Sequence, residues 1–423
     1  MSNATVTTRE CGTDAHAAKA LTVEQARKRI MAAVEPVSGV EKIALRSALG
    51  RILAEDIFSP IDVPSHTNSA VDGYALANAS LSAETTKLRI IGTSWAGKPF
   101  SGRVRAGECV RIMTGAVVPE GTDTVVMQEH VQFLGSAIDV TAGIPPGENV
   151  RAAGEDLAKG QMALAKGKQI MPPELGLLAS LGTVEVAVWR HLRVAFFSTG
   201  DELRSLGQSL SEGEIYDSNR YTLFGMLTRL GVEILDMGVI RDDRDAIECA
   251  FLEAAANADV IITSGGVSVG EADYVKETLE RLGEIDFWQI AMKPGRPLAY
   301  GRVRGSTFFG LPGNPVSVMV TFYQFVEQAL RHMMGQSNAR SALTTFKVRC
   351  ASRLHKKPGR TEFQRGILES DDTGELVVRA TGQQGSGILR SMSAANCFVI
   401  LPRDSQTVEP GTLVDVQPFH GIL

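Results

Sequence analysis

Residues 259–274 read D-V-I-I-T-S-G-G-V-S-V-G-E-A-D-Y, and this stretch decides the fold. Residues 260–263 predict a short buried strand, which breaks into Gly265 and Gly266 before Gly270 leads into a helix. Glycine lets backbone N–H groups approach a ligand closely, and a helix N-terminus adds partial positive charge. The stretch therefore predicts a strand, a loop and a helix. The loop is either an oxyanion site or a plain glycine turn, and the stretch alone does not favour one over the other.

Strand and helix patterns alternate on both sides of this stretch. The predicted strands cover residues 192–198, 232–239, 259–263 and 285–292. The predicted helices cover residues 220–230, 244–256, 273–282 and 316–334. Alternation at this spacing predicts a doubly wound, mainly parallel sheet with helices on both faces, and ligands bind such sheets at the carboxyl ends of the strands.

Charged residues follow the predicted strands at those ends. Glu202, Asp242 and Asp273 come after three of them, and Lys293 and Arg296 follow the fourth. Carboxylates hold divalent cations, whereas ammonium and guanidinium groups hold phosphate oxygens. Because these residues converge on one edge of the sheet, the sequence predicts a metal-assisted phosphate site there.

The flanking segments predict an α/β and β multi-domain chain. Residues 59–156 contain short β-like runs between turn residues and predict an inserted β-rich domain. Residues 21–58 and 157–182 have helical periodicity and predict a small helical linking domain around that insertion. Residues 183–335 form the predicted α/β domain, and residues 340–423 predict a C-terminal β-sandwich or barrel.

Composition excludes several classes of protein. The 423-residue chain has a net charge of -5, which argues against a dedicated nucleic-acid binder. No apolar run approaches the length of a membrane span, and the N-terminal residues carry no apolar signal core. The five cysteines are scattered and never form C-x-x-C, so neither a disulfide framework nor a zinc knuckle is expected, and a reducing cytoplasm is.

Other motifs are weak when they are taken alone. Asp72 lies in a turn and is more typical of a turn former than of a catalyst. Residues 92–98 resemble a phosphate-binding P-loop, but Pro99 stands where the magnesium-binding hydroxyl should be, so no P-loop is predicted. Arg365 and Ser386 by themselves indicate a surface arginine and a loop serine.

The chain nevertheless carries six motifs in register: S-A-V-D-G-Y-A, R-I-M-T-G-A-x-V-P-E-G, S-T-G-D-E-L, S-G-G-V-S-V-G-E-x-D-Y, M-K-P-G-R-P-L and L-P-G-N-P-V-S. Together they resemble the molybdopterin molybdotransferase family, the MoeA proteins related to the gephyrin E-domain, over about residues 20–423. The resemblance implies an elongated four-part protomer in a homodimer. Its active cleft would lie between the doubly wound domain of one subunit and the β-rich domains of the other.

The resemblance also implies an activity. Members convert adenylylated molybdopterin and molybdate into molybdenum cofactor and AMP, with Mg2+ or a similar divalent cation. Catalytic roles are implied for Asp72, Thr114, Glu202, Asp242 and Asp273, of which the last three would also hold the metal. Substrate-binding roles are implied for Gly265, Gly266, Ser268, Gly270, Lys293, Arg296, Pro312, Pro315, Arg365 and Ser386. Molybdopterin adenylyltransferase and other proteins of the pathway would be its partners, with no nucleic acid and no membrane.

One departure and two alternatives accompany the resemblance. Gln289 stands where family members often carry lysine, which leaves Arg302 and Lys276 as alternative cations. A molybdopterin adenylyltransferase is one alternative activity, but it should not need the two β domains. A gephyrin-like scaffold is the other, but it should carry a long linker and an appended domain.

Overall fold

The computed structural model describes residues 20–82, 84–265, 274–338 and 343–419. Contacts divide the chain into two compact units. The first unit comprises Met1–Glu41, Gly50–Ile52 and Trp189–Leu423, and the second comprises Lys42–Leu49 and Leu53–Val188. Among the described helices, none has both the length and the apolar character needed to cross a bilayer.

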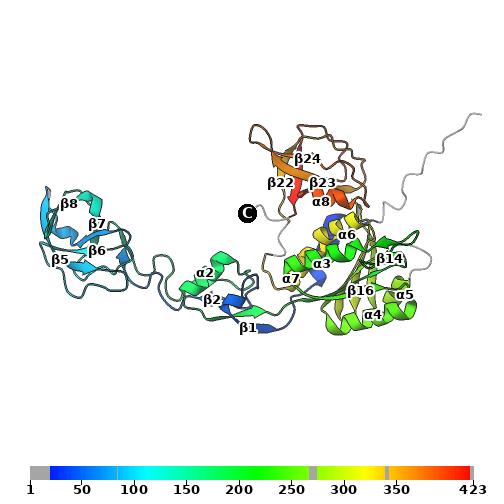
Figure 1. The fold of residues 1–423 in the computed structure, drawn as a ribbon, viewed down its shortest axis with the longest axis horizontal. Helices are drawn as coiled ribbons and strands as arrows, with labels where there is room; N and C mark the ends of the chain where they lie inside the picture. The colour runs from blue at the N-terminus through cyan, green and yellow to red at the C-terminus, as the bar shows by residue number, and fades with distance from the viewer. Residues whose placement is uncertain (1–19, 83, 266–273, 339–342, 420–423) are drawn as a thin grey trace, which may run out of the picture. The chain divides into compact units, whose positions relative to one another are not determined.

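The second unit contains a six-stranded sheet with the order β7-β4-β6-β5-β9-β8 (Figure 1). Its strands are β4 (Gly73–Leu76), β5 (Thr86–Ser94), β6 (Glu108–Ile112), β7 (Thr124–Met127), β8 (Val131–Phe133) and β9 (Ala137–Val140). All neighbouring strands pair antiparallel except β5 and β6, which are parallel. Buried Leu76, Leu88, Val126 and Ile138 pack together in its core. The β-like runs of this segment therefore form one sheet.

The P-loop-like residues 92–98 are part of that sheet. Gly92 lies inside β5, and Trp95 and Lys98 exchange two backbone hydrogen bonds of 3.0 and 2.9 Å across a tight turn. A P-loop would instead open a helix after the strand. The structure thus confirms that this stretch is not a P-loop.

Three two-stranded sheets lie along residues 40–189. They pair β1 (Val40–Ala44) with β12 (Glu185–Trp189), β2 (Ile57–Phe58) with β11 (Met162–Leu164), and β3 (Asn68–Ser69) with β10 (Val150–Arg151). Helix α2 (Pro172–Ser180) begins with proline, which suits a first turn because proline has no N–H to leave unpaired there. In the second unit, Leu53, Leu164, Leu178 and Val186 share a small core. Helix α1 (Val23–Ala33) instead belongs to the first unit.

The first unit is built on a six-stranded sheet with the order β16-β13-β17-β21-β20-β18. Its strands are β13 (Arg193–Thr199), β16 (Glu233–Ile240), β17 (Val260–Ser264), β18 (Gly283–Gln289), β20 (Pro297–Val303) and β21 (Ser306–Leu311). Strands β16, β13, β17 and β21 are parallel, and β20 is antiparallel to both β21 and β18. Since β18 consequently points the same way as the parallel strands, only β20 opposes them. The predicted mainly parallel sheet is confirmed.

Strands β20 and β21 form a hairpin that the sequence patterns did not predict. Its two-residue turn consists of Arg304 and Gly305, with φ angles of 47° and 101°. Positive φ at both positions is typical of the turn that matches the twist of a hairpin. The turn was missed because its first residue is arginine rather than the asparagine or glycine that usually marks it.

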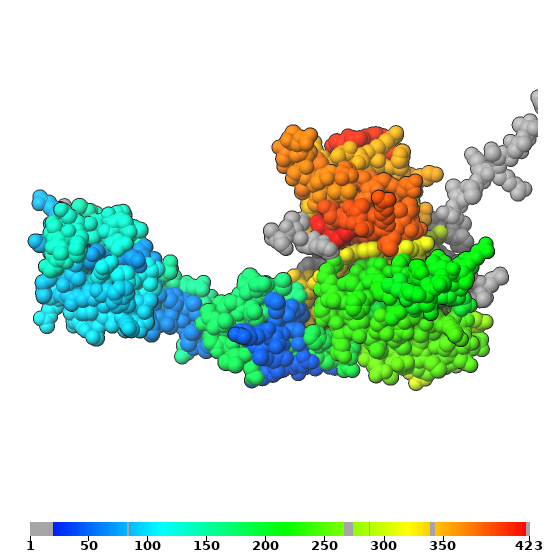
Figure 2. Space-filling model, viewed as in Figure 1, coloured from blue at the N-terminus to red at the C-terminus, as the bar shows by residue number. Residues whose placement is uncertain are grey.

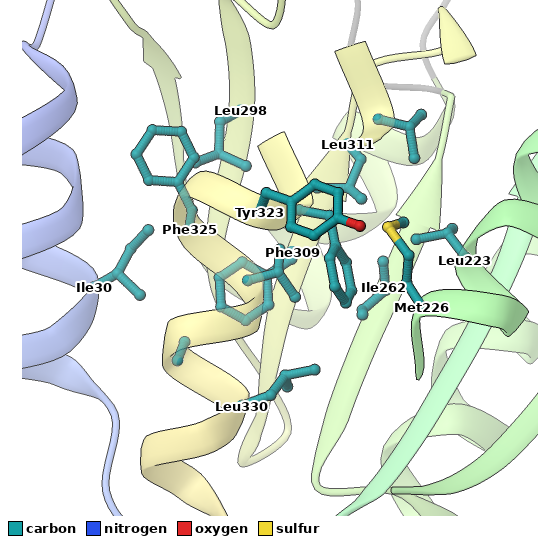
Figure 3. Close-up of a cluster of buried hydrophobic side chains, with 14 of the residues drawn as sticks. Ile30, Leu223, Met226, Ile262, Leu298, Phe309, Leu311, Tyr323, Phe325 and Leu330 are labelled. Atoms are coloured by element: carbon teal, nitrogen blue, oxygen red, sulfur yellow. The ribbon is translucent and has the colours of Figure 1, made fainter. Parts of the chain in front are cut away.

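Helices cover both faces of this sheet. On one face, α1, α3 (Ser218–Leu230), α6 (Pro315–Thr321) and α7 (Glu327–Met333) contribute to one large core. Figure 3 shows Ile30, Leu223 and Leu330 from these helices around Phe309 of β21. On the other face, α4 (Arg244–Asn257) and α5 (Tyr274–Leu282) pack against alternate residues of the same strands. The sheet is therefore doubly wound.

The helix predicted over residues 316–334 is present, but it is not α-helical throughout. A π-helical turn, Phe322–Val326, separates α6 from α7, and all five of its side chains are buried. Within it, Tyr323 stacks on Phe419 with ring centroids 5.5 Å apart and meets Phe398 edge-on at 5.7 Å. A π turn inserts one residue without interrupting an apolar run, so hydrophobic periodicity does not distinguish it from an α-helix.

The C-terminal strands close into a five-stranded barrel, which settles the choice between sandwich and barrel. They are β22 (Phe346–Cys350), β23 (Thr361–Ser370), β24 (Leu376–Ala380), β25 (Cys397–Leu401) and β26 (Leu413–Pro418). Pairing of β23 with β25 closes the ring. A two-residue strand of the first unit, β19 (Met292–Lys293), pairs in parallel with β23 and so joins the chain after β18 to the barrel.

Candidate functional site

Five strands of the first unit end at the same edge of the sheet, which we call the rim. The strand register places Ser264 of β17 beside Ser198 of β13 and Leu311 of β21. Ile240, which ends β16, pairs with Thr199. Loops that follow these strands therefore begin side by side, as the alternation predicted.

Three acids gather where β13 and β16 end. The Asp242 N–H donates to Oδ1 of Asp201 over 3.4 Å. The pKa of the Asp242 carboxyl lies above its usual value because the group is partly desolvated and because Asp201 and Glu202 repel its charge. Gly200 has φ of 149°, and a Cβ at this position would collide with the Glu202 carboxylate. The structure thus brings Glu202 and Asp242 together. It also adds Asp201, which the sequence analysis did not single out.

The third predicted metal ligand, Asp273, lies outside the described residues. Within the described ranges, no group of three or more His, Cys, Asp or Glu side chains is arranged to hold a metal ion. Asp201, Glu202 and Asp242 form an acidic cluster. Metal binding by Glu202, Asp242 and Asp273 stays a prediction.

The glycine loop after β17 is described only at its start, because Gly266, Ser268 and Gly270 lie outside the described residues. Gly265 has φ of 91°, and a Cβ there would lie 2.8 Å from the Thr199 carbonyl oxygen. Its N–H donates to the Leu311 carbonyl over 3.2 Å. Only glycine fits this backbone between the ends of β13 and β21.

The loop after β21 lies next to Gly265. A Cβ on Gly313 would be 4.0 Å from the Gly265 Cα. Pro312 and Pro315 flank this residue and Asn314, and Pro315 opens α6. The sequence analysis missed a neighbour of this loop, Asn219 of α3, whose side-chain amide donates to Ser264 Oγ at 2.8 Å and to the Gly313 carbonyl at 2.7 Å.

The predicted cations follow β18. Lys293 is half-exposed, and its Nζ lies 3.5 Å from Oε1 of Glu362 in the barrel. Arg296 is partly buried in the same loop. Between them, a Cβ on Gly295 would lie 2.7 Å from Thr321 Oγ1, so the loop packs closely on α6.

Ser386 of the barrel contacts the same helix, α6, and Arg365 is held by the neighbouring residue Gly385. The Val316 N–H of α6 donates to the Ser386 carbonyl over 3.1 Å. The Arg365 guanidinium donates to Ser391 Oγ at 3.0 Å and to the Gly385 carbonyl at 3.1 Å. Burial alone lowers its pKa to about 10, so no described carboxylate offsets its charge. Arg365 is 1% exposed and is therefore not the surface residue that it resembles when taken alone.

Asp72 and Thr114 form a pair in the second unit. Both the N–H and the Oγ1 hydroxyl of Thr114 donate to Asp72 Oδ1, each over 2.7 Å. These two bonds lower the pKa of Asp72, and the backbone bond has the larger effect. The charge of Arg111 lowers the pKa further. Two residues far apart in the chain thus build one exposed anionic group.

Of the two alternative cations for Gln289, Arg302 does not reach the rim from its strand, β20. Arg302 pairs with Glu284 near the start of β18, at the opposite edge of the sheet, because β20 runs antiparallel. Its guanidinium donates to the Ala33 carbonyl at 3.2 Å. The expectation that Arg302 replaces the missing lysine is therefore wrong. Lys276 forms an ion pair with Glu280 on α5 over 3.8 Å.

Family profiles match most of the chain. A profile described as the MoeA N-terminal region (domain I and II) matches residues 21–182. One described as a probable molybdopterin binding domain matches residues 195–332. One described as the MoeA C-terminal region (domain IV) matches residues 347–419.

Relatives and solved structures agree with these profiles. The chain is 43% identical to a protein from Haemophilus influenzae named molybdopterin molybdenumtransferase, over 95% of this chain and 100% of that protein. It is 33% identical to gephyrin from Dictyostelium discoideum, over 93% of this chain and 61% of gephyrin. A crystal structure of a molybdopterin biosynthesis moeA protein from Pyrococcus horikoshii superposes with a TM-score of 0.83 at 30% identity, covering 95% of this chain and 100% of that one.

Proposed function

Because this chain belongs to the MoeA family and inserts molybdenum during synthesis of the molybdenum cofactor, we propose that it consumes adenylylated molybdopterin and molybdate and releases AMP. Neither the adenylyltransferase nor the scaffold alternative is favoured, since the chain aligns with the whole of a named molybdenumtransferase. We keep the four-domain division, the cytoplasmic location and the pathway partners as parts of this proposal.

The observation that carries the proposal is the buried charge of Arg365. A pKa lowered to about 10 by burial corresponds to a cost on the order of 3 kcal/mol for keeping the guanidinium charged. No described carboxylate offsets that cost, whereas an oxyanion such as molybdate would. Ser386 lies beside the Gly385 carbonyl that holds Arg365, and we assign both residues to the molybdate pocket.

The rim loops would bind the nucleotide part of the substrate. Gly265 allows close approach of backbone to phosphate, and Lys293 and Arg296 offset the repulsion between two anions in one site. Pro312 and Pro315 restrict the loop before α6, so that it is ordered before substrate arrives. The chain's own groups thus bind, orient and stabilise the departing phosphate.

We further propose that Glu202, Asp242 and Asp273 hold Mg2+ or a similar divalent cation. Carboxylate oxygens are its preferred ligands. Desolvation and then repulsion from Asp201 and Glu202 raise the pKa of Asp242, and a bound cation would offset both. When bound, such a cation neutralises charge on the phosphate oxygens as AMP leaves. Asp201 is an additional acid that could share this role.

Asp72 and Thr114 are proposed as cleft residues that the β-rich domain of a partner subunit provides. The lowered pKa keeps Asp72 ionised at neutral pH, so it acts as a hydrogen-bond acceptor only. Such a group can orient a water molecule or a substrate hydroxyl. The two bonds from Thr114 fix the position of the acceptor oxygen.

A homodimer is supported by apolar side chains on the surface of the first unit. Tyr221 and Phe224 of α3 are 48% and 46% exposed, and Ile215 and Leu206 before this helix are 54% and 57% exposed. This bright green segment lies on the visible surface in Figure 2. Tyr221 and Phe224 are three residues apart and so lie on one face of α3, and exposed apolar surface is typical of protein interfaces. Sedimentation of the purified protein should give a dimer, and Phe224→Glu should shift it to monomer.

The activity is tested by incubating the purified protein with adenylylated molybdopterin and Mg2+, with or without molybdate, and measuring AMP. Molybdate-dependent release of AMP is expected. ATP consumption with bare molybdopterin would instead identify an adenylyltransferase. Replacing molybdate with tungstate in the same assay determines which oxyanion is preferred, and omitting Mg2+ tests the metal proposal.

A further inference from the structure

Asn219 lies in the first turn of α3 and connects two loops of the rim. Its Nδ2 group donates one hydrogen to Ser264 Oγ at 2.8 Å and the other to the Gly313 carbonyl at 2.7 Å. Both donors of the side-chain amide are therefore used, which fixes which end of the amide faces these loops. Its Oδ1 atom is buried and has no hydrogen-bond partner among the described residues.

The two acceptors belong to the loops that the proposed activity uses. Ser264 ends β17 directly before Gly265, and Gly313 stands between Pro312 and Asn314 in the loop after β21. The bond from the Gly265 N–H to the Leu311 carbonyl is where the ladder between these two strands gives way to the loops. Beyond that point, Asn219 bridges them from a third element.

The bridge sets the direction of polar groups at the rim. Because Ser264 Oγ accepts from Asn219, the hydroxyl hydrogen of Ser264 must be directed to another acceptor. Because a peptide group is planar, fixing the Gly313 carbonyl also fixes the N–H of Asn314 on the opposite side of that peptide. One side chain thus orients donors in two loops.

We propose that Asn219 is a positioning residue that holds Ser264 and Gly265, at the end of β17, in register with Gly313 and Asn314 of the loop after β21, so that these residues bind the phosphate of the adenylylated substrate. The inference deepens the proposed function and rests on it. The bridge requires an uncharged hydrogen-bond donor at position 219. If aspartate replaced Asn219, its ionised carboxylate could not donate to the Gly313 carbonyl, whereas a protonated carboxyl could donate to it and accept from the Ser264 hydroxyl.

That requirement makes Asn219→Asp a pH-dependent variant. At neutral pH the new carboxylate loses the bond to Gly313 and repels its carbonyl, so kcat/KM should fall about tenfold or more relative to wild type. As the pH falls and the carboxyl becomes protonated, the ratio to wild type should recover. Asn219→Ala has neither donor, so its loss should not depend on pH.

The matched control is Asn257→Asp. Asn257 donates within α4, to the Glu253 carbonyl at 2.8 Å, and takes no part in the rim. This variant should follow the wild-type pH profile. Recovery of Asn219→Asp at acid pH also shows that the variant folds.

The measurement is kcat and KM for adenylylated molybdopterin between about pH 5 and about pH 8, for wild type and the three variants. A pH profile of Asn219→Asp parallel to wild type, or Asn219→Ala with wild-type kinetics, would overturn the inference. If the wild type itself releases no AMP, the proposed function fails. Titration of the same variants with adenylylated molybdopterin, without turnover, then tests the bridge by binding alone and with the same two outcomes.

Discussion

Lys293 and Glu362 face each other where β19 pairs with β23, with Nζ 3.5 Å from Oε1. Glu362 is the buried partner, and its other oxygen accepts from Gln364 Nε2 at 3.0 Å. Lys356 is also buried nearby. Burial lowers the pKa of Lys356 below its usual 10.5, and the charge of Glu362 opposes that shift. The Glu362 carboxylate therefore interacts electrostatically with both Lys293 and Lys356.

Glu362→Gln should destabilise the protein by about 1–3 kcal/mol at neutral pH, because buried Lys356 keeps its charge without a compensating carboxylate. The loss should shrink as the pH rises through the lowered folded pKa of Lys356 and should disappear above 10.5, where Lys356 is neutral in both the folded and the unfolded state. Urea unfolding at several pH values measures this. Glu369 lies on the same strand as Glu362, and Glu369→Gln, which removes only an exposed ion pair with Arg379 of β24, is the control and should change stability little. An equal loss in both variants would contradict the prediction.

Asp242→Asn should lower the rate of AMP release by about 100-fold and raise the melting temperature. In the wild type, the raised pKa of Asp242 means that stability falls as the pH rises from 3.8 through the folded pKa, because the ionised group is partly desolvated and is repelled by Asp201 and Glu202. The variant lacks this fall. Scanning calorimetry with and without Mg2+ tests both effects, since Mg2+ should stabilise wild type more than the variant. Equal stabilisation by Mg2+ would remove Asp242 from the proposed metal site.

Thr114→Ala should weaken the hydrogen bonding to the Asp72 carboxylate, because it removes the hydroxyl donor and keeps the backbone N–H donor. The pKa of Asp72 should rise toward 3.8, and any acid limb of the kcat/KM profile that reports Asp72 should move to higher pH. Asp72→Asn should reduce kcat by about 100-fold or more at all pH values. Thr122→Ala is a suitable control, since Thr122 donates only to the Pro119 carbonyl in the same unit. NMR titration of the Asp72 carboxyl in the Thr114 variant checks the shift directly.

Arg365→Lys should raise the KM for molybdate about tenfold or more while leaving the KM for adenylylated molybdopterin nearly unchanged. Lysine keeps the charge but cannot reproduce the fixed fork of donors that a guanidinium offers to an oxyanion. Steady-state kinetics with each substrate varied in turn separates the two constants. Arg379→Lys, at an exposed ion pair on β24, is the control. An unchanged KM for molybdate would place the oxyanion elsewhere.

The sequence predicted the parallel part of the sheet well because β13, β16 and β17 are short apolar runs followed by helices with clear caps, such as Asp243 before α4. It did not predict β20 and β21, whose turn has positive φ at Arg304. As a result, the sequence analysis assumed the wrong edge of the sheet for Arg302. Without β20, the position of Arg302 at the opposite edge of the sheet could not be recognised.

Residue type alone also limited the prediction of the site. Glu202 and Asp242 were recognised because acids follow several predicted strands that end at one edge of the sheet, and the structure brings both together with Asp201. Asn219 was missed because asparagine near a helix start is ordinary, and its importance depends on Ser264 and Gly313, which are 45 and 94 residues away. Contacts of such long separation leave no local pattern in a single sequence.

The pairing of β19 with β23 has a practical consequence for attempts to divide the chain. Two residues of β19 donate and accept along an edge of the barrel, so a fragment that stops before the barrel would expose that edge to solvent or to another copy. It would also leave Phe309 and Tyr323 in a core stripped of Phe363 and Phe398. The excised α/β part should therefore fold poorly and aggregate. In the whole chain, the α/β part and the barrel should unfold in one thermal transition.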